Sequence, residues 1–237
     1  MFVTKFVYSL IFISLFTLQD CLSNPFYPVS GSETNYPDTL KEDQLLYIGK
    51  VWNSLYYKVS GNEFLFTSNF MNGSVSINGR YFKNVRLKYD IYTDALLTPT
   101  NRGRIIILNK EMVDSFSLDV GSRTYNFIRS NNDSSAILDG YYNVLYKGKS
   151  VLCVKYKKVI QPPEIDRLYY LFYEWHNIFV IKDGVVYNVN TRRSLLNVFG
   201  AERNQVKKYI NKNRLLVSKN DPDSYISILK FYESLAN

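Results

Sequence analysis

The amino-acid sequence predicts an α+β protein: an antiparallel β-meander, barrel-like or a sandwich, followed by a small C-terminal helical segment. Aromatic residues make up 16% of the 237 residues, including 21 Tyr and 15 Phe, and such flat rings favour the half-buried surface of a strand. Short apolar runs alternate with tight-turn signals across residues 64–158, whereas helical spacing of apolar residues begins only after residue 190. Strands that precede helices, instead of alternating with them, are typical of the α+β class.

Residues 1–23 have the pattern of a signal peptide. Lys5 supplies a short positive region, and residues 6–18 form an apolar run that is too short for a bilayer span of about 20 residues. Residues 24–44 are predicted to be a linker, because their first part is rich in Pro, Ser and Asn. That composition argues against the alternative of a buried N-terminal helix. The sequence therefore predicts export, with no membrane-spanning segment after signal removal.

Two ways of processing the leader remain open. Cys21-Leu22-Ser23 places small residues where a signal peptidase would cleave before Asn24. Alternatively, Leu18-Gln19-Asp20-Cys21 imitates a lipobox, in which Cys21 would become the acylated first residue. In either case Cys153 is the one ordinary thiol left, so the mature fold is expected to have no intrachain disulfide.

Residues 45–160 form the predicted antiparallel β domain. Apolar runs at residues 45–48 and 55–57 favour short strands at its start. Asn78-Gly79 marks a type I′ hairpin, because both residues tolerate positive φ. The β-branched run at residues 105–108 is typical of a centrally placed strand.

Residues 161–237 are predicted to form a β-hairpin, with its turn at Lys182-Asp183-Gly184, and C-terminal helices packed on or beside the β domain. Thr191 is expected to lie near the start of a short helix that Gly200 closes. Asp221-Pro222-Asp223 has the composition of a helix start, with an acid at the N-cap and Pro at the first helical position. The apolar face of that last helix would hold Tyr225, Ile228, Leu229, Tyr232 and Leu235.

Several spaced phrases occur along the chain: Phe70-Met71-Asn72-Gly73-Ser74-Val75, Asn78-Gly79, Val85-Arg86-Leu87-Lys88-Tyr89-Asp90-Ile91-Tyr92-Thr93-Asp94, Gly140-Tyr141-Tyr142-Asn143-Val144-Leu145-Tyr146-Lys147-Gly148-Lys149, Arg193-Ser194-Leu195-Leu196, Val206-Lys207-Lys208-Tyr209-Ile210, Asn213 and Phe231-Tyr232-Glu233-Ser234-Leu235. In their order and spacing they resemble a family of uncharacterised secreted and cell-envelope proteins of Bacteroidota. The resemblance covers roughly residue 64 to the end, and departs from the family at Ala95-Leu96-Leu97. It implies a periplasmic, outer-membrane-associated or secreted protein without an assigned activity. It also implies O-glycosylation at Thr39, within Asp38-Thr39-Leu40.

Scarce reactive side chains limit the chemistry that this chain can perform. A single histidine, His176, excludes a multi-histidine zinc site and leaves few ways to build a Ser-His-Asp triad. The sequence has no glycine-rich phosphate loop, CxxC pair or HExxH motif, so no cofactor and no metal is implied. Asp90 and Asp94 could serve a hydrolase, but four residues of strand separate side chains by about 13 Å. We expect Trp175-His176 to be an ordinary aromatic anchor beside a polar residue.

Basic residues interleaved with Tyr are the remaining functional signal. The candidates for contact with a polyanion are Lys147, Lys149, Lys155, Lys157, Lys158, Arg192, Arg193, Lys207 and Lys208. The export signal counts against nucleic acid as the partner. The sequence thus predicts a non-enzymatic envelope protein that binds another envelope protein or an anionic envelope surface. The alternatives are a carboxylate-dependent hydrolase of envelope or extracellular polymers, and a binder of small lipophilic ligands.

Overall fold

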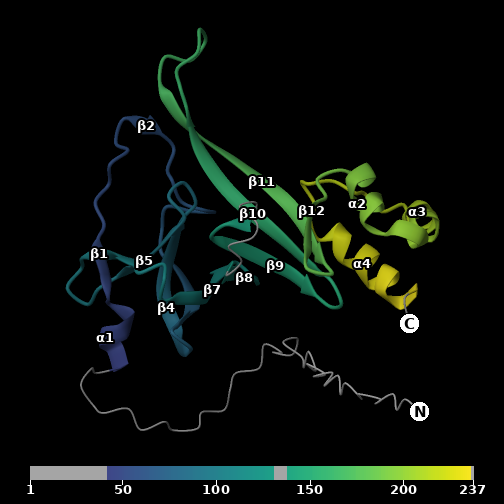
Figure 1. The fold of residues 1–237 in the computed structure, drawn as a ribbon. Helices are drawn as coiled ribbons and strands as arrows, with labels where there is room; N and C mark the ends of the chain where they lie inside the picture. Colours follow the sequence, from purple (N-terminus) through teal and green to yellow (C-terminus); the bar gives the residue numbers. More distant parts are fainter. Residues whose placement is uncertain (1–41, 131–137, 236–237) are drawn as a thin grey trace, which may run out of the picture. The chain divides into compact units, whose positions relative to one another are not determined.

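A computed structural model describes residues 42–130 and 138–235 (Figure 1). The predicted signal peptide, Cys21, Thr39 and most of the predicted linker lie outside the described residues. The described chain begins with helix α1 (Glu42–Leu46), so the expected strand at residues 45–48 was wrong. The strand expected at residues 55–57 was wrong as well, because the nearest strands are at residues 49–51 and 59–60. In a helix, Leu45 and Leu46 can both turn towards the β core, which the alternation of a strand would not allow.

Twelve strands build one sheet within the described residues. They are β1 (Gly49–Val51), β2 (Val59–Ser60), β3 (Met71–Ile77), β4 (Arg80–Asp90), β5 (Ala95–Pro99), β6 (Ile105–Leu108), β7 (Val113–Val120), β8 (Arg123–Arg129), β9 (Tyr141–Lys147), β10 (Val151–Gln161), β11 (Tyr170–Lys182) and β12 (Val185–Asn188). Asn78 and Gly79 both have positive φ between β3 and β4, which confirms the predicted hairpin turn. Asp183 and Gly184 also have positive φ, in the turn between β11 and β12.

The strand order confirms an antiparallel meander. It reads β1-β6-β5-β4-β3-β7-β8-β9-β10-β11-β12, with the short β2 pairing in parallel with β11. The path is not closed, so of the two predicted forms the sandwich-like one is present. The expected boundary near residue 160 falls at the end of β10, and β11 continues the same sheet.

Strand β4 connects the two layers of the sandwich-like part of the sheet. Its residues 80–87 pair with β3, whereas residues 88–90 pair with β5. A strand that passes from one layer to the other in this way lets the two layers face each other. Side chains of β5 and β6 accordingly share one hydrophobic core with side chains of β3, β7 and β8.

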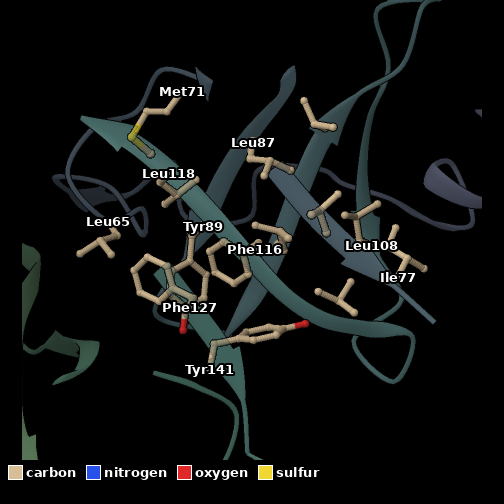
Figure 2. Packing of buried hydrophobic residues seen from close by; sticks show 14 of the residues in the cluster. Leu65, Met71, Ile77, Leu87, Tyr89, Leu108, Phe116, Leu118, Phe127 and Tyr141 are labelled. Carbon is tan, nitrogen blue, oxygen red and sulfur yellow. The ribbon is translucent and has the colours of Figure 1, made fainter. Parts of the chain in front are cut away.

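Aromatic rings fill the centre of this first core (Figure 2). Phe116 and Phe127 stack with ring centroids 4.7 Å apart, and Tyr89 meets both rings edge-on at 5.2 and 5.3 Å. Tyr141 of β9 closes the group against Tyr89 and Phe116. The aromatic enrichment that predicted strands therefore also supplies the interior of the β domain.

The helices cover β10 and β11 and form a second core with them (Figure 1). They are α2 (Arg192–Val198), the 3-10 turn η2 (Gly200–Glu202), α3 (Arg203–Lys212) and α4 (Ser224–Leu235). Thr191 caps α2, as predicted, and the structure adds a capping box with Ser194. The predicted apolar face of α4 is buried at Tyr225, Ile228, Leu229 and Tyr232. None of the helices in the described part of the chain is long and apolar enough to cross a bilayer.

Candidate functional site

The strongest candidate is a surface that we call the cationic helical surface. Its members are the exposed basic residues of α2, α3 and the segment that follows: Arg192, Arg193, Arg203, Lys207, Lys208, Lys212, Arg214 and Lys219. Residues 192–219 contain these eight cations and one acid, Glu202, so they carry a net charge of +7. The whole chain has a net charge of +8, so this segment carries nearly all of it.

Local packing turns these cations outward. Val206 and Ile210 fix the buried stripe of α3, which leaves the basic residues of the helix on its remaining surface. The Arg192 guanidinium donates a hydrogen bond to Asn211 Oδ1 and thereby ties α2 to α3. Tyr209 stacks on Phe231 of α4, with centroids 4.0 Å apart and ring planes 6° apart. The surface is therefore held on a packed helical support.

No carboxylate neutralises the cationic helical surface within the described residues. Among residues 42–130 and 138–235, none of its eight cations has a carboxylate oxygen within the 4.0 Å of an ion pair. Charges of one sign raise the local potential and attract counter-ions of the opposite sign. This geometry is suited to binding an anionic partner.

The predicted basic residues of the β9–β10 hairpin divide into two groups. Lys147, Lys149 and Lys157 are exposed, in agreement with a surface role. Lys155 and Lys158 lie on opposite faces of β10, and each is largely buried by a different segment. Lys155 Nζ contacts Asp94, and Lys158 Nζ contacts the Phe64 carbonyl. The structure therefore brings Lys155 and Lys158 to internal polar networks and not to the helices.

Lys155 belongs to a network around Asp94. One Asp94 oxygen accepts from the Tyr89 hydroxyl at 2.5 Å and lies 3.5 Å from Lys155 Nζ, while the other accepts from Lys110 Nζ at 2.7 Å. Lys155 Nζ also donates to the carbonyl oxygens of Asp139 and Tyr141. Burial lowers the pKa of Lys155, although Asp94 opposes that shift. The network joins the β4–β5 turn to β9 and β10.

A second internal network surrounds Lys158 and Lys88. Lys158 Nζ donates to the Phe64 carbonyl at 2.5 Å and lies 3.4 Å from Glu174. Lys88 Nζ lies over the ring of Phe64 at 4.3 Å, and burial lowers its pKa. Glu63 is 4% exposed, and burial raises the pKa of its carboxyl. The charges of Lys88 and Lys158 oppose that shift, although Glu63 Oε1 has no hydrogen-bond partner among the described residues.

The two carboxylates considered for hydrolysis are both occupied by structural contacts. Asp90 ends β4, and its side chain accepts from the backbone N–H groups of Tyr92 and Thr93 and from the Thr93 hydroxyl. Burial raises the pKa of Asp90, against the effect of those hydrogen bonds. Asp94 lies in the following turn with φ at 57°. Its contacts with Tyr89, Lys110 and Lys155 hold the carboxylate in place.

His176 and Cys153 also have structural surroundings. His176 Nε2 lies 2.6 Å from the carbonyl oxygen of Lys219, so this nitrogen donates and links β11 to the segment before α4. Cys153 is fully buried in β10, and burial raises the pKa of its thiol to about 12. A buried thiol with such a pKa is a poor nucleophile at neutral pH.

A groove of about 660 Å³ between α1, β4 and β5 was missed by the sequence analysis. Its polar and aromatic lining includes Tyr47, Tyr81, Lys83, Asn84, Arg86 and Asn101. These residues come from segments that are up to 54 positions apart in the sequence, so no local motif predicts the groove. Lys83 Nζ lies 6.0 Å from the ring centroid of Tyr81, at the outer limit of a cation–π contact.

Neither the described side chains nor the comparisons with known proteins point to a cofactor. Within residues 42–130 and 138–235, no group of three or more His, Cys, Asp or Glu side chains is placed to hold a metal ion. No protein-family model, curated protein or solved structure matches the chain. The cationic helical surface remains the feature with the clearest chemistry.

Proposed function

We propose that this chain is an exported, non-enzymatic protein of the cell envelope that binds an anionic envelope polymer or surface through the cationic helical surface. The observation that carries the proposal is the concentration of charge, because residues 192–219 hold +7 of the net +8. Export is inferred from the leader-like pattern of residues 1–23.

The helices suit this role because they present charge without having to reorganise. Long basic side chains on a packed support can follow an irregular polyanion, and each contact releases condensed counter-ions. The binding should therefore weaken steeply with salt and depend little on the sequence of the polymer. Tyr209, half-buried beside these cations, adds an aromatic edge to the surface.

A hydrolase would need a free pair of carboxylates, and the contacts of Asp90 and Asp94 support a binding role instead. Asp90 accepts hydrogen bonds from the turn that follows it, and Asp94 forms ion pairs with two lysines. Releasing either carboxylate for acid–base chemistry would leave buried partners without their acceptor, at a cost of about 1–3 kcal/mol for each unsatisfied group.

The proposal is tested by titrating the purified mature protein with fluorescently labelled dextran sulfate. The helix variant is Lys207→Gln/Lys208→Gln/Lys212→Gln, and its charge-matched control is Lys50→Gln/Arg102→Gln/Arg104→Gln, whose three cations are also exposed. We expect the helix variant to lose about tenfold or more in affinity, at roughly 0.5 kcal/mol or more for each lost contact, and the control to change little. Equal losses in the two variants would contradict the proposal.

Export is tested separately, because the leader does not take part in the polyanion assay. Cell fractionation and N-terminal sequencing should find the mature chain in the envelope or medium, starting at Asn24 or at an acylated Cys21. A cytoplasmic chain with an intact leader would overturn the envelope assignment, whatever its affinity for dextran sulfate.

A further inference from the structure

The β10–β11 hairpin carries an apolar tip that neither the cores nor the cationic helical surface uses. Ile165 is 98% exposed and Leu168 is 87% exposed, although both are large aliphatic residues. The paired partners β9 and β12 reach only residues 151–154 of β10 and residues 179–182 of β11. The distal part of the hairpin therefore extends beyond its neighbours, as Figure 1 shows.

The chemistry of the hairpin changes in order along its length. Ile165 and Leu168 form the tip, and Tyr169 and Tyr170, each about half exposed, come directly behind them. The ion pair between Lys158 and Glu174 lies further down the hairpin. Glu164, Asp166 and Arg167 also lie in the tip, which therefore mixes aliphatic and charged side chains. Exposed aliphatic side chains followed by tyrosines are typical of segments at the interface of a bilayer.

Part of the backbone of the tip is hydrogen-bonded within the tip. Glu164 and Arg167 exchange two backbone hydrogen bonds, at 2.8 and 3.0 Å, around the turn. The Arg167 guanidinium donates to the carbonyl oxygen of Pro162 at 2.7 Å, and Pro162 and Pro163 have no N–H group to satisfy. A segment that enters an apolar medium must pair its polar groups internally in this way.

A neighbouring segment adds to the apolar tip. Val59 of β2 pairs in parallel with Tyr170, which directs the residues before Val59 towards the tip. Tyr57 is 81% exposed there, and Lys58 Nζ lies 5.6 Å from the centroid of its ring. A tyrosine and a lysine together are suited to the level of lipid headgroups.

We propose that the hairpin tip inserts shallowly into the interface of a lipid bilayer. Glu164 lies 3.7 Å from Arg167, so these two charges compensate each other, whereas Asp166 at the apex limits the depth of entry. Lys58 balances Asp166 in charge, so the inserting region is close to neutral and should not require anionic lipids. The inference does not depend on the proposed function, because the tip and the cationic helical surface belong to different elements.

The experiment is co-sedimentation of the full mature chain with vesicles of pure phosphatidylcholine, at low and at high salt. The tip variant is Ile165→Asp/Leu168→Asp, and the matched control is Leu216→Asp/Val185→Asp, which changes two exposed apolar residues elsewhere. We expect the wild type and the control to bind at both salt concentrations. The tip variant should lose roughly tenfold or more of its partitioning, because a buried aliphatic side chain contributes about that factor.

A Leu168→Trp variant gives a second measurement that does not depend on loss of binding. Its added indole should emit at shorter wavelength in the presence of vesicles and be quenched by lipids brominated along their acyl chains. Failure of the wild type to bind phosphatidylcholine would overturn the inference, as would binding that high salt abolishes. A tip variant that keeps vesicle binding but loses binding to another protein would show that the tip docks on a protein instead.

Discussion

Lysines of β10 and lysines of α3 look alike in the sequence but have opposite roles in the structure. Lys155 and Lys158 of β10 are held by Asp94, Glu174 and backbone carbonyls inside the molecule. Lys207 and Lys208 of α3 are exposed and have no ion pair among the described residues. The difference shows that composition alone does not identify a binding surface.

Topology explains the difference. Segments distant in the sequence lie against β10 at Lys155 and at Lys158, so a lysine at either position needs an internal partner. A helix on the outside of the fold buries one stripe and can present charge over the rest of its surface. The comparison therefore predicts that changes in β10 affect stability, whereas changes in α3 affect binding.

The largest expected effect is on the internal network of β10. Asp94→Asn removes the negative charge that faces Lys110 and Lys155 and weakens the acceptor for Tyr89. We expect the free energy of unfolding to fall by about 2–3 kcal/mol, because the mostly buried Lys155 and the buried Tyr89 hydroxyl lose their charged acceptor. Urea denaturation measures this change. Lys157→Gln, at an exposed position of the same strand, is the control and should change stability by less than about 0.5 kcal/mol.

The next effect concerns the contact between α4 and the β9–β10 hairpin. Glu233 accepts from the Tyr146 hydroxyl at 2.7 Å and from the Ser150 hydroxyl and backbone N–H at 2.7 and 2.8 Å. Burial alone would raise the pKa of Glu233, but these hydrogen bonds outweigh burial and lower it. Glu233→Gln should reduce stability by about 1–2 kcal/mol at neutral pH, measured by urea denaturation.

The lowered pKa of Glu233 also fixes the sign of a pH effect. The stability that this carboxylate contributes is present above its ordinary pKa of 4.5 and is lost as the pH falls through the lower folded value. The difference in stability between wild type and Glu233→Gln should therefore shrink on acidification. A difference that grows at acidic pH would contradict this account of the contact.

Charge reversal on α3 should affect binding with little effect on stability. Lys207→Glu/Lys208→Glu places two acids on the cationic helical surface, and we expect affinity for dextran sulfate to fall about tenfold or more. The midpoint of urea unfolding should stay unchanged, because both side chains are exposed. A variant that unfolds at lower urea but keeps its affinity for dextran sulfate would contradict the expectation that α3 affects binding and not stability.

The smallest expected effect comes from Glu63. Burial raises its pKa, so the folded state binds this proton more tightly than the unfolded state, and stability falls as the pH rises from 4.5 through the raised folded value. Thermal unfolding from acidic to neutral pH should show this slope in the wild type and a smaller one in Glu63→Gln.

Local signals in the sequence predicted the meander, its turns and the helices that follow. The two hairpin turns require positive φ, which Asn78-Gly79 and Asp183-Gly184 adopt. The start of α2 depends on Thr191 and Ser194. A few adjacent residues therefore decide each of these features. The last helix begins at Ser224, shortly after the predicted start at Asp221-Pro222-Asp223. Its buried face was nevertheless predicted correctly.

Features that depend on distant pairs were not predictable in the same way. Lys155 is 61 residues from Asp94, and Lys158 is 94 residues from Phe64, so their inward orientation follows from strand order and not from any local pattern. The change of pairing partner along β4, from β3 to β5, likewise depends on strand order and not on a local pattern. The exposed basic residues of α3 could be identified because helical spacing separates them from Val206 and Ile210.

The salt dependence of binding to dextran sulfate tests the central claim most directly. The logarithm of the association constant is measured against the logarithm of salt concentration for the wild type, for Lys207→Gln/Lys208→Gln/Lys212→Gln and for Lys147→Gln/Lys149→Gln/Lys157→Gln. We expect the helix variant to lose about one unit of slope for each lysine that contacts the polymer, and the hairpin variant to keep the wild-type slope. An unchanged slope in the helix variant, or an equal loss in the hairpin variant, would contradict the assignment of binding to the helices.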